Sequence, residues 1–231
     1  MSKNILVTGA SRGIGYETAL KLASQGHTVI VTARSEDKLN KLAKSSSSGR
    51  IIPVAADLTL NDDIQKLAAA VSELDTLDGL INNAGAVHRE AFMDTDIEVF
   101  KSLMDVNVYG IVRLTKALKK YLVEGSHILN ISSMSGYQGS LKFGGLSAYG
   151  AAKAAVVGLS EVLSAEFSSE GIAVNCLCIG AVQTEMLSEA FPGFQAPVSP
   201  EQMGTYIANF ILSGHQFYNG KVLPVALNDP G

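Results

Sequence analysis

The segment TGASRGIG, residues 8–15, decides the fold of this chain. The apolar run just before it, residues 4–8, predicts a short buried strand, and residues 14–24 carry apolar side chains at helical spacing. Three glycines lie where the chain must turn tightly and enter that helix: Gly9, Gly13 and Gly15. Glycine at such a turn lets the backbone approach a pyrophosphate, which binds at the positive end of the helix. Strand, loop and helix in this order therefore predict a dinucleotide-binding turn.

The same alternation of strand and helix continues along the chain. Further strands are predicted at residues 28–32, 51–54, 79–82, 127–131, 173–177 and 221–225, with helices at 36–44, 62–72, about 96–121 and about 148–168. Strands that alternate with helices form parallel sheets built of crossover units. We therefore expect an α/β fold, a single-domain Rossmann fold with a doubly wound, parallel, seven-stranded sheet and helices on both faces. One domain should cover residues 1–231, because no repeat or linker interrupts it.

Composition excludes several classes of function. The chain has 231 residues, 47% of them hydrophobic, and a net charge of -4 with scattered Lys and Arg, so nucleic acid is not an expected partner. No apolar run is long enough to cross a bilayer and Met1 is followed almost at once by a strand, which predicts a cytoplasmic protein without membrane contact. Cys176 and Cys178, two apart in an apolar segment, favour buried reduced thiols over a disulfide or a metal pair. No metal site is expected.

Tyr149 and Lys153 form a candidate proton-transfer pair. They are four residues apart in a predicted helix, so their side chains emerge on one face. A carbonyl oxygen that receives a hydride needs a proton, and tyrosine, whose ordinary pKa is about 10, can supply one if its conjugate base is stabilised. A nearby lysine ammonium does this by favouring the phenolate. A packed aromatic ring and a solvated charge are the alternative reading of the same two residues.

The chain as a whole resembles the short-chain dehydrogenase/reductase family, because it contains both TGxxxGIG and YxxxK, here YGAAK. The resemblance implies an oxidoreductase that transfers a hydride between a nicotinamide cofactor and a carbonyl or alcohol substrate, with Tyr149 as general acid or base. It also implies that Ser133, in NISSMSG at the end of a strand, polarises the substrate oxygen. Asn107, in DVNVYG, would connect Lys153 to solvent through its backbone carbonyl and a bound water.

The resemblance also implies a set of cofactor-binding residues. In the turn they are Thr8, Gly9, Ser11, Arg12, Gly13, Ile14 and Gly15; on the adenine side Arg34, Asp57, Leu58, Asn83, Ala84 and Gly85; and toward the nicotinamide Tyr149, Lys153, Gly180, Val182 and Thr184. NADP(H) is favoured over NAD(H), because Ala33 stands where NAD sites carry a carboxylate and Arg34 and Arg12 can pair with a 2'-phosphate. An ordinary pair of surface arginines is the alternative.

Three departures from the family pattern concern the site and the chain end. Ile179 replaces the usual proline, which puts the rigidity of the following loop in doubt, and Ser133 and Tyr149 are sixteen positions apart, a few more than is common. The last six residues, 226–231, also differ from the usual aspartate-glycine ending.

The substrate is expected between residues 134–145 and residues 184–197, with a short substrate loop near 184–200. These segments offer apolar side chains that could equally belong to the core: Tyr137, Phe143, Leu146, Met186, Phe191 and Phe194. No cluster of Arg or Lys marks them, so an uncharged ketone or aldehyde, or a 3-oxoacyl thioester, is favoured. His88 could reach the pocket mouth, but a surface role is the simpler interpretation.

Two other functions and an assembly state complete the expectations. A redox sensor that binds NADP(H) without turnover usually lacks part of the Tyr-Lys pair, and extended epimerases or dehydratases need a substrate domain for which 231 residues leave no room.

The helices around Asn107 and Ala155 are apolar on more than one face, which predicts a homodimer or homotetramer packed through them.

Overall fold

The computed structural model describes residues 2–46, 48 and 50–227. Seven strands form one sheet: β1 (Asn4–Thr8), β2 (Thr28–Ala33), β3 (Arg50–Ala55), β4 (Leu77–Asn82), β5 (Leu122–Ser133), β6 (Ala173–Ile179) and β7 (Val222–Val225). They are parallel and lie in the order β3-β2-β1-β4-β5-β6-β7. The chain therefore winds outward from β1 in one direction and from β4 in the other. Ligands of such sheets bind at the carboxyl edge near this reversal.

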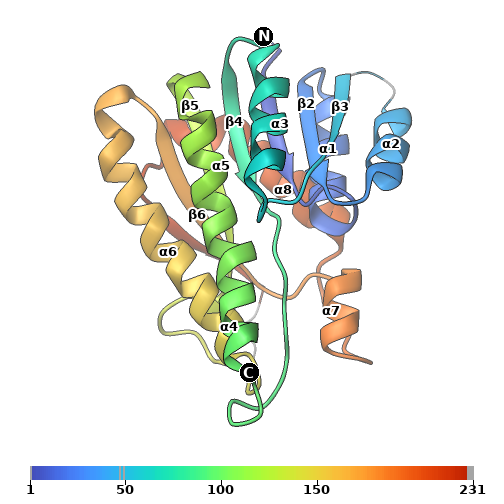
Figure 1. The fold of residues 1–231 in the computed structure, drawn as a ribbon, viewed down its shortest axis with the longest axis vertical. Helices are drawn as coiled ribbons and strands as arrows, with labels where there is room; N and C mark the ends of the chain where they lie inside the picture. Colours follow the sequence, from blue (N-terminus) through green and yellow to red (C-terminus); the bar gives the residue numbers. More distant parts are fainter. Residues whose placement is uncertain (1, 47, 49, 228–231) are drawn as a thin grey trace.

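Helices cover both faces of the sheet, as predicted (Figure 1). They are α1 (Gly13–Ser24), α2 (Glu36–Ser45), α3 (Asn61–Ser72), α4 (Ile97–Met104), α5 (Gly110–Leu118), α6 (Ser147–Phe167), α7 (Glu185–Ala190) and α8 (Pro200–Ser213). Leu22 of α1 and Ile207 of α8 belong to one buried cluster, whereas Leu67 of α3 and Leu114 of α5 belong to another on the opposite face. The doubly wound fold expected from the sequence is confirmed.

The segment predicted as one helix over residues 96–121 is divided. After α4 the chain makes a π-helical turn, Asp105–Tyr109, before α5, and a short 3-10 turn, Lys119–Tyr121, ends the segment. The N–H of Gly110 donates to the carbonyl of Asp105, five residues earlier, which marks the wider turn. Periodicity alone missed it, because the turn is held by tertiary hydrogen bonds of Asn107 to the loop after β4. Asn107 lies at the centre of this turn and is fully buried.

The other expectations concern the start of one strand, the two cysteines and the end of the chain. Strand β5 begins at Leu122 instead of residue 127, and its pairing with β4 shifts register between Leu77 and Gly79. Cys176 and Cys178 are free, buried thiols on β6, as expected. The unusual chain ending falls mostly on residues 228–231, outside the described residues. Among the described residues, no helix is both long and apolar enough to cross a bilayer.

Candidate cofactor cleft and active site

The glycine turn between β1 and α1 depends on the absence of side chains. Gly9 has φ 69°, and a Cβ there would lie 2.8 Å from Cα of Ala84, while a Cβ on Gly15 would lie 2.5 Å from the carbonyl oxygen of Gly9. The first turn of α1 holds no acidic residue, and Arg12 at its N-cap makes no side-chain capping bond. Because the N–H groups at a helix start otherwise lack partners, this end of α1 is suited to an anion such as a pyrophosphate.

Thr8 and Asn83 fasten the glycine turn to the end of β4. The Thr8 hydroxyl donates to the carbonyl of Ile81 at 3.2 Å and accepts from the backbone N–H groups of Asn83 and Ala84 at 2.9 and 3.0 Å. The Asn83 amide donates back to the carbonyl of Thr8 at 2.9 Å. Thr8 is 1% exposed, so it contributes to the site by holding the glycine turn against the loop after β4 and not by facing the cleft.

One cleft of about 500 Å³ follows the carboxyl edge of the sheet from α2 to α6. Fifteen of the predicted catalytic and cofactor-binding residues line it: Gly9, Ser11, Arg12, Gly13, Ile14, Arg34, Asp57, Leu58, Asn83, Ala84, Gly85, Asn107, Tyr149, Lys153 and Thr184. Thr8, Gly15, Ser133, Gly180 and Val182 do not line it. Of these, Gly180 packs so closely on Ala226 that a Cβ would lie 2.7 Å from the Ala226 Cβ, and Val182 is 4% exposed.

Cations gather at the α2 end of this cleft. Arg34 and Lys38 are both exposed and line it; Arg34 directly follows Ala33, the last residue of β2, and Lys38 lies in the first turn of α2. Lys38 belongs to none of the motifs recognised in the sequence, although its position four residues after Arg34 at the start of a helix was the available signal. Asp57 lies nearby and accepts from the N–H and hydroxyl of Thr59 at 2.9 and 2.7 Å through a single oxygen, Oδ1.

Tyr149, Lys153 and Ser133 come together at the α6 end. Nζ of Lys153 lies 5.8 Å from the ring centre of Tyr149 and donates to the carbonyl of Ile131 at 2.9 Å. Ser133 is the last residue of β5; its hydroxyl is hydrogen-bonded to Tyr149 and accepts from the N–H of Ser135 at 3.1 Å. The neighbouring Ser132 hydroxyl donates to the carbonyl of Lys153 at 2.8 Å, which fastens β5 to α6.

Burial dominates the ionisation of both α6 residues. It raises the pKa of Tyr149, and the hydrogen bond from Ser133 opposes this in part. It also lowers the pKa of Lys153 from 10.5 to about 8. The sequence suggested that Lys153 would lower the pKa of Tyr149; in the structure the direction is opposite, because removal of the phenolate from water outweighs the hydrogen bond.

Asn107 ties the π-helical turn to the loop after β4. Its amide group donates to the carbonyls of Ala86 and Leu103 at 3.0 and 2.9 Å, and its Oδ1 accepts from the N–H of Ala86 at 3.2 Å. A Cβ on Gly85 would lie 2.6 Å from this oxygen and 3.4 Å from Nζ of Lys153. Gly85 therefore lies between the side-chain oxygen of Asn107 and the ammonium of Lys153, where a larger residue would not fit.

A second cavity, of about 620 Å³, lies beyond the cleft between the loop after β4, the loop before α6, and α7. Its lining includes His88, Arg89, Glu90, Gly145 and Glu189. His88 therefore reaches this cavity. Its Nε2 lies 3.0 Å from the carboxylate of Glu90, which also lines the cavity.

The aromatic residues predicted for the substrate region separate into different environments. Phe191 lies 5.8 Å from Phe143 and 6.5 Å from Phe194 between ring centres, with Arg89 stacked 4.6 Å above the Phe191 ring. Leu146 is a buried core residue, and Tyr137 packs against the buried cluster around Met134. Met186 lines the cofactor cleft, as does Ile179, which replaces the usual proline.

Known proteins share both the sequence pattern and the fold. The family model for short chain dehydrogenases matches residues 3–193. An oxidoreductase of Botryotinia fuckeliana, BOA17, is 36% identical over 188 residues, which are 80% of this chain and 68% of that protein. A 3-oxoacyl-[acyl-carrier-protein] reductase of Synechocystis is 33% identical over 187 residues, 78% of this chain and 74% of that protein.

Solved structures agree with this assignment. A dehydrogenase/reductase from Sinorhizobium meliloti superposes with a TM-score of 0.90 at 26% identity, covering 100% of this chain and 96% of that one. A short chain dehydrogenase from Burkholderia cenocepacia, solved in complex with NADP, has a TM-score of 0.89 at 25% identity and covers 99% and 98%. The chain therefore belongs to the short-chain dehydrogenase/reductase family and is an oxidoreductase that acts on CH–OH or carbonyl groups.

Proposed function

We propose that this protein uses NADP(H), in preference to NAD(H), to interconvert a carbonyl compound and its alcohol, with Tyr149 as general acid and base. The observation that carries the proposal is the single cleft that runs from Arg12, Arg34 and Lys38 to Tyr149 and Lys153. One extended ligand with an anionic end and a reactive end fits such a cleft. When bound, the nicotinamide supplies or accepts the hydride.

The adenine-ribose end supports the choice of NADP(H). Arg12, Arg34 and Lys38 line it, and Ala33 offers no carboxylate to repel a 2'-phosphate. Among the solved relatives, one is described in complex with NADP and another, a 3-ketoacyl-(acyl-carrier-protein) reductase from Brucella melitensis, with NADH. The family accordingly accepts both cofactors, and the preference rests on this chain's own cations.

The glycine turn fits the pyrophosphate. The start of α1 has neither an acidic side chain nor a side-chain cap, and Gly9 and Gly13 keep the backbone accessible at the cleft. A Cβ on Gly13 would lie 3.2 Å from the Thr184 side chain, so this glycine also allows the loop after β6 to close on the turn. We assign Thr184 and the backbone near Val182 to the nicotinamide end, with Gly180 at the start of the loop that carries them.

Proton transfer is assigned to Tyr149 and Ser133. Burial keeps the phenol protonated at neutral pH, which suits its donation of a proton to the oxygen of a reduced carbonyl. The Ser133 hydroxyl is hydrogen-bonded to Tyr149, so a substrate oxygen placed between the two groups would be held by both.

Lys153 and Asn107 are assigned to the return of the proton. Lys153 is 5% exposed and lies behind the tyrosine, with its ammonium hydrogen-bonded to the sheet at Ile131. Asn107 holds the wide helical turn against Gly85, next to the Lys153 ammonium. A proton lost by Tyr149 would be replaced from solvent by way of Asn107 and Lys153. Lys153 would also bond the ribose next to the nicotinamide.

For the substrate we propose an uncharged ketone or aldehyde, or a 3-oxoacyl thioester, bound over the nicotinamide beside the loop near residues 184–200. Phe143, Phe191 and Phe194 provide apolar surface there. The relative in Synechocystis is named a 3-oxoacyl-[acyl-carrier-protein] reductase, which supports the thioester as a first substrate to test.

We also propose a homodimer or homotetramer formed through the outer faces of the π-helical turn, α5 and α6. Tyr109 is 49% exposed and Val162 57% exposed on these elements. Exposed apolar side chains on neighbouring helices favour self-association.

The decisive experiment replaces Tyr149 by Phe, which keeps the ring and removes the hydroxyl. Turnover of a carbonyl panel with NADPH should fall by about a thousandfold or more, while NADPH affinity measured by calorimetry stays near that of the parent. Lys153→Met should reduce both turnover and affinity. A Tyr149→Phe protein that binds NADPH and reduces a good substrate within about threefold of the parent rate would exclude tyrosine as the acid.

A further inference from the structure

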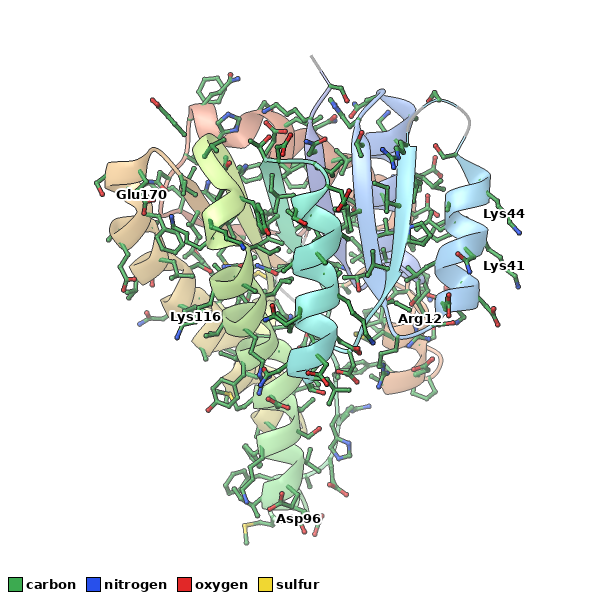
Figure 2. The ribbon with its side chains drawn as sticks, turned by 45° about the horizontal axis from the view of Figure 1, so that its top comes forward. Arg12, Lys41, Lys44, Asp96, Lys116 and Glu170 are labelled. Carbon is green, nitrogen blue, oxygen red and sulfur yellow. The ribbon has the colours of Figure 1, made fainter. Side chains whose placement is uncertain are left out.

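The ion pair between Arg12 and Glu189 joins the glycine turn to α7. Nη1 of Arg12 lies 2.7 Å from Oε1 of Glu189, and Nη2 lies 3.5 Å from Oε2. Both terminal nitrogens of the guanidinium therefore face one carboxylate. Figure 2 shows Arg12 just above α7, on the inner side of α2. The contact spans 177 positions of sequence, so motif spacing could not have suggested it.

The Glu189 carboxylate lies among the cations of the cofactor cleft. Its hydrogen bond with Arg12 is the main cause of its lowered pKa, and attraction to Arg12 and Lys38 adds to it. Arg12 and Lys38 both line the cleft, at the end we assigned to the 2'-phosphate. An anion supplied by α7 thus lies where an anion of the cofactor is expected.

We propose that Glu189 competes with the 2'-phosphate of NADP(H) for Arg12 and thereby limits the preference for NADP(H) over NAD(H). This inference rests on the proposed function, in which Arg12 binds that phosphate. A guanidinium offers two parallel donors to one anion at a time in this geometry, so the phosphate must displace the carboxylate to gain the same contact. NAD(H) has no 2'-phosphate and leaves the pair intact.

The competition also connects the cofactor to the substrate side. Glu189 lines the second cavity, beside Arg89 and Glu90. When Arg12 turns to the phosphate, the Glu189 carboxylate is left without that partner on the cavity wall. Binding of NADP(H), and not of NAD(H), therefore changes the charge that α7 presents to the second cavity.

The size of the effect follows from exposure. The side chains of Arg12 and Glu189 are 38% and 65% exposed, so the pair is screened by solvent. Pairs of this kind change an equilibrium by roughly 1.5- to 5-fold. Removal of the competing carboxylate should therefore raise NADPH affinity by about two- to fivefold.

The test compares Glu189→Gln with Glu170→Gln by calorimetric titration with NADPH and with NADH. Glu170 pairs with Lys119 at 2.6 Å, with side chains 53% and 26% exposed, on the opposite side of the molecule from Arg12 (Figure 2). We expect Glu189→Gln to bind NADPH about two- to fivefold more tightly, with NADH affinity unchanged. Glu170→Gln should match the parent with both cofactors, and Glu189→Lys should bind NADPH more tightly than Glu189→Gln.

The outcomes separate this inference from the proposed function. If the parent binds NADH as tightly as NADPH, the cofactor preference itself is wrong. If the parent prefers NADPH and Arg12→Gln reduces that preference, but Glu189→Gln binds NADPH no better or more weakly, then the preference stands and competition by Glu189 is overturned. Equal gains for NADPH and NADH would also overturn it, because the effect would not depend on the 2'-phosphate.

Discussion

The side-chain amide of Asn175 donates a hydrogen bond to Nε2 of His127 at 3.0 Å, inside the sheet. The orientation of this amide is fixed on its other sides, because its nitrogen donates to the carbonyl of Tyr218 and its oxygen accepts from the N–H of Lys221. Nδ1 of His127 lies 3.1 Å from the carbonyl of Ile211 and must carry the ring proton. A neutral imidazole satisfies both contacts; a protonated ring would place an N–H against the donor of Asn175.

Acid should therefore weaken the fold through His127. Burial lowers the pKa of His127 from 6.5 to about 4, so as the pH falls the unfolded chain is protonated before the folded one. The contribution of the neutral ring to stability is therefore present above pH 6.5 and lost as the pH falls toward 4. The full loss is on the order of 3 kcal/mol. Urea unfolding measured from pH 7 to pH 4 checks this: His127→Gln should be less stable at pH 7 but show a flatter pH dependence. The same slope in both proteins would contradict the prediction.

Lys153→Met should make the unliganded protein more stable near pH 7. The lowered pKa means that the folded state binds the Lys153 proton less tightly than the unfolded chain does. Below pH 8 the buried charge therefore costs stability, and the free energy of unfolding rises as the pH increases from 8 to 10.5. Loss of the bond to Ile131 offsets part of the gain, leaving about 1–2 kcal/mol.

Urea unfolding of Lys153→Met at pH 7 and pH 10 measures this effect, with Lys116→Met, an exposed lysine on α5, as the control. The gain should shrink at pH 10, and the control should stay within about 0.5 kcal/mol of the parent at both values. A loss of stability in Lys153→Met at pH 7 would show that the ammonium is better accommodated than its burial implies.

Gly136→Ala should reduce turnover, although Gly136 is not among the predicted catalytic or cofactor-binding residues. A Cβ there would lie 2.4 Å from the backbone carbon of Lys153 and 2.6 Å from the nitrogen of Ala154, so the loop before α6 or the helix itself must move. A displacement of this size at a proton-transfer residue typically reduces turnover about a hundredfold. Steady-state kinetics, with circular dichroism to verify folding, provides the measurement, and Ser135→Ala next to it should remain within about threefold of the parent.

Val162→Glu combined with Tyr109→Glu should yield a monomer. Two charges on the exposed faces of α6 and the π-helical turn would be buried without partners in the proposed interface. Light scattering at micromolar concentration measures the mass, and Val123→Glu, an exposed apolar position at the start of β5, should leave it unchanged. A parent protein that is already monomeric would refute the interface itself.

Much of this fold was predictable because apolar runs and glycines are local signals. Each strand was found within a few residues, since β-strands such as Ala173–Ile179 are buried on both faces and read as continuous apolar runs. The π-helical turn was not found, because its cause is tertiary: Asn107 bonds to the loop after β4, far away in sequence.

The site was predictable to the same extent. Fifteen of the residues taken from the motifs line the cleft, because most of them follow strands whose carboxyl ends meet at one edge of the parallel sheet. The motifs did not reveal that Arg12 is paired with Glu189, or that burial would raise the pKa of Tyr149. Both facts depend on how loops from distant parts of the chain pack together.

The wide turn at Asp105–Tyr109 has a consequence for the surfaces of the two helices that it joins. One additional residue in a helix advances the later side chains by about 100° around the axis, since a turn contains 3.6 residues. The face that α4 directs toward α6 and the face that α5 directs toward α3 are therefore out of phase along a single rod. If the same residues formed a regular helix here, every later side chain of α5 would be rotated by about 100°, and Leu114 and Leu118 would turn away from the buried cluster that they share with Leu67 of α3. The wide turn that holds Asn107 is thus also what allows α4 and α5, along one axis, to pack against two different helices.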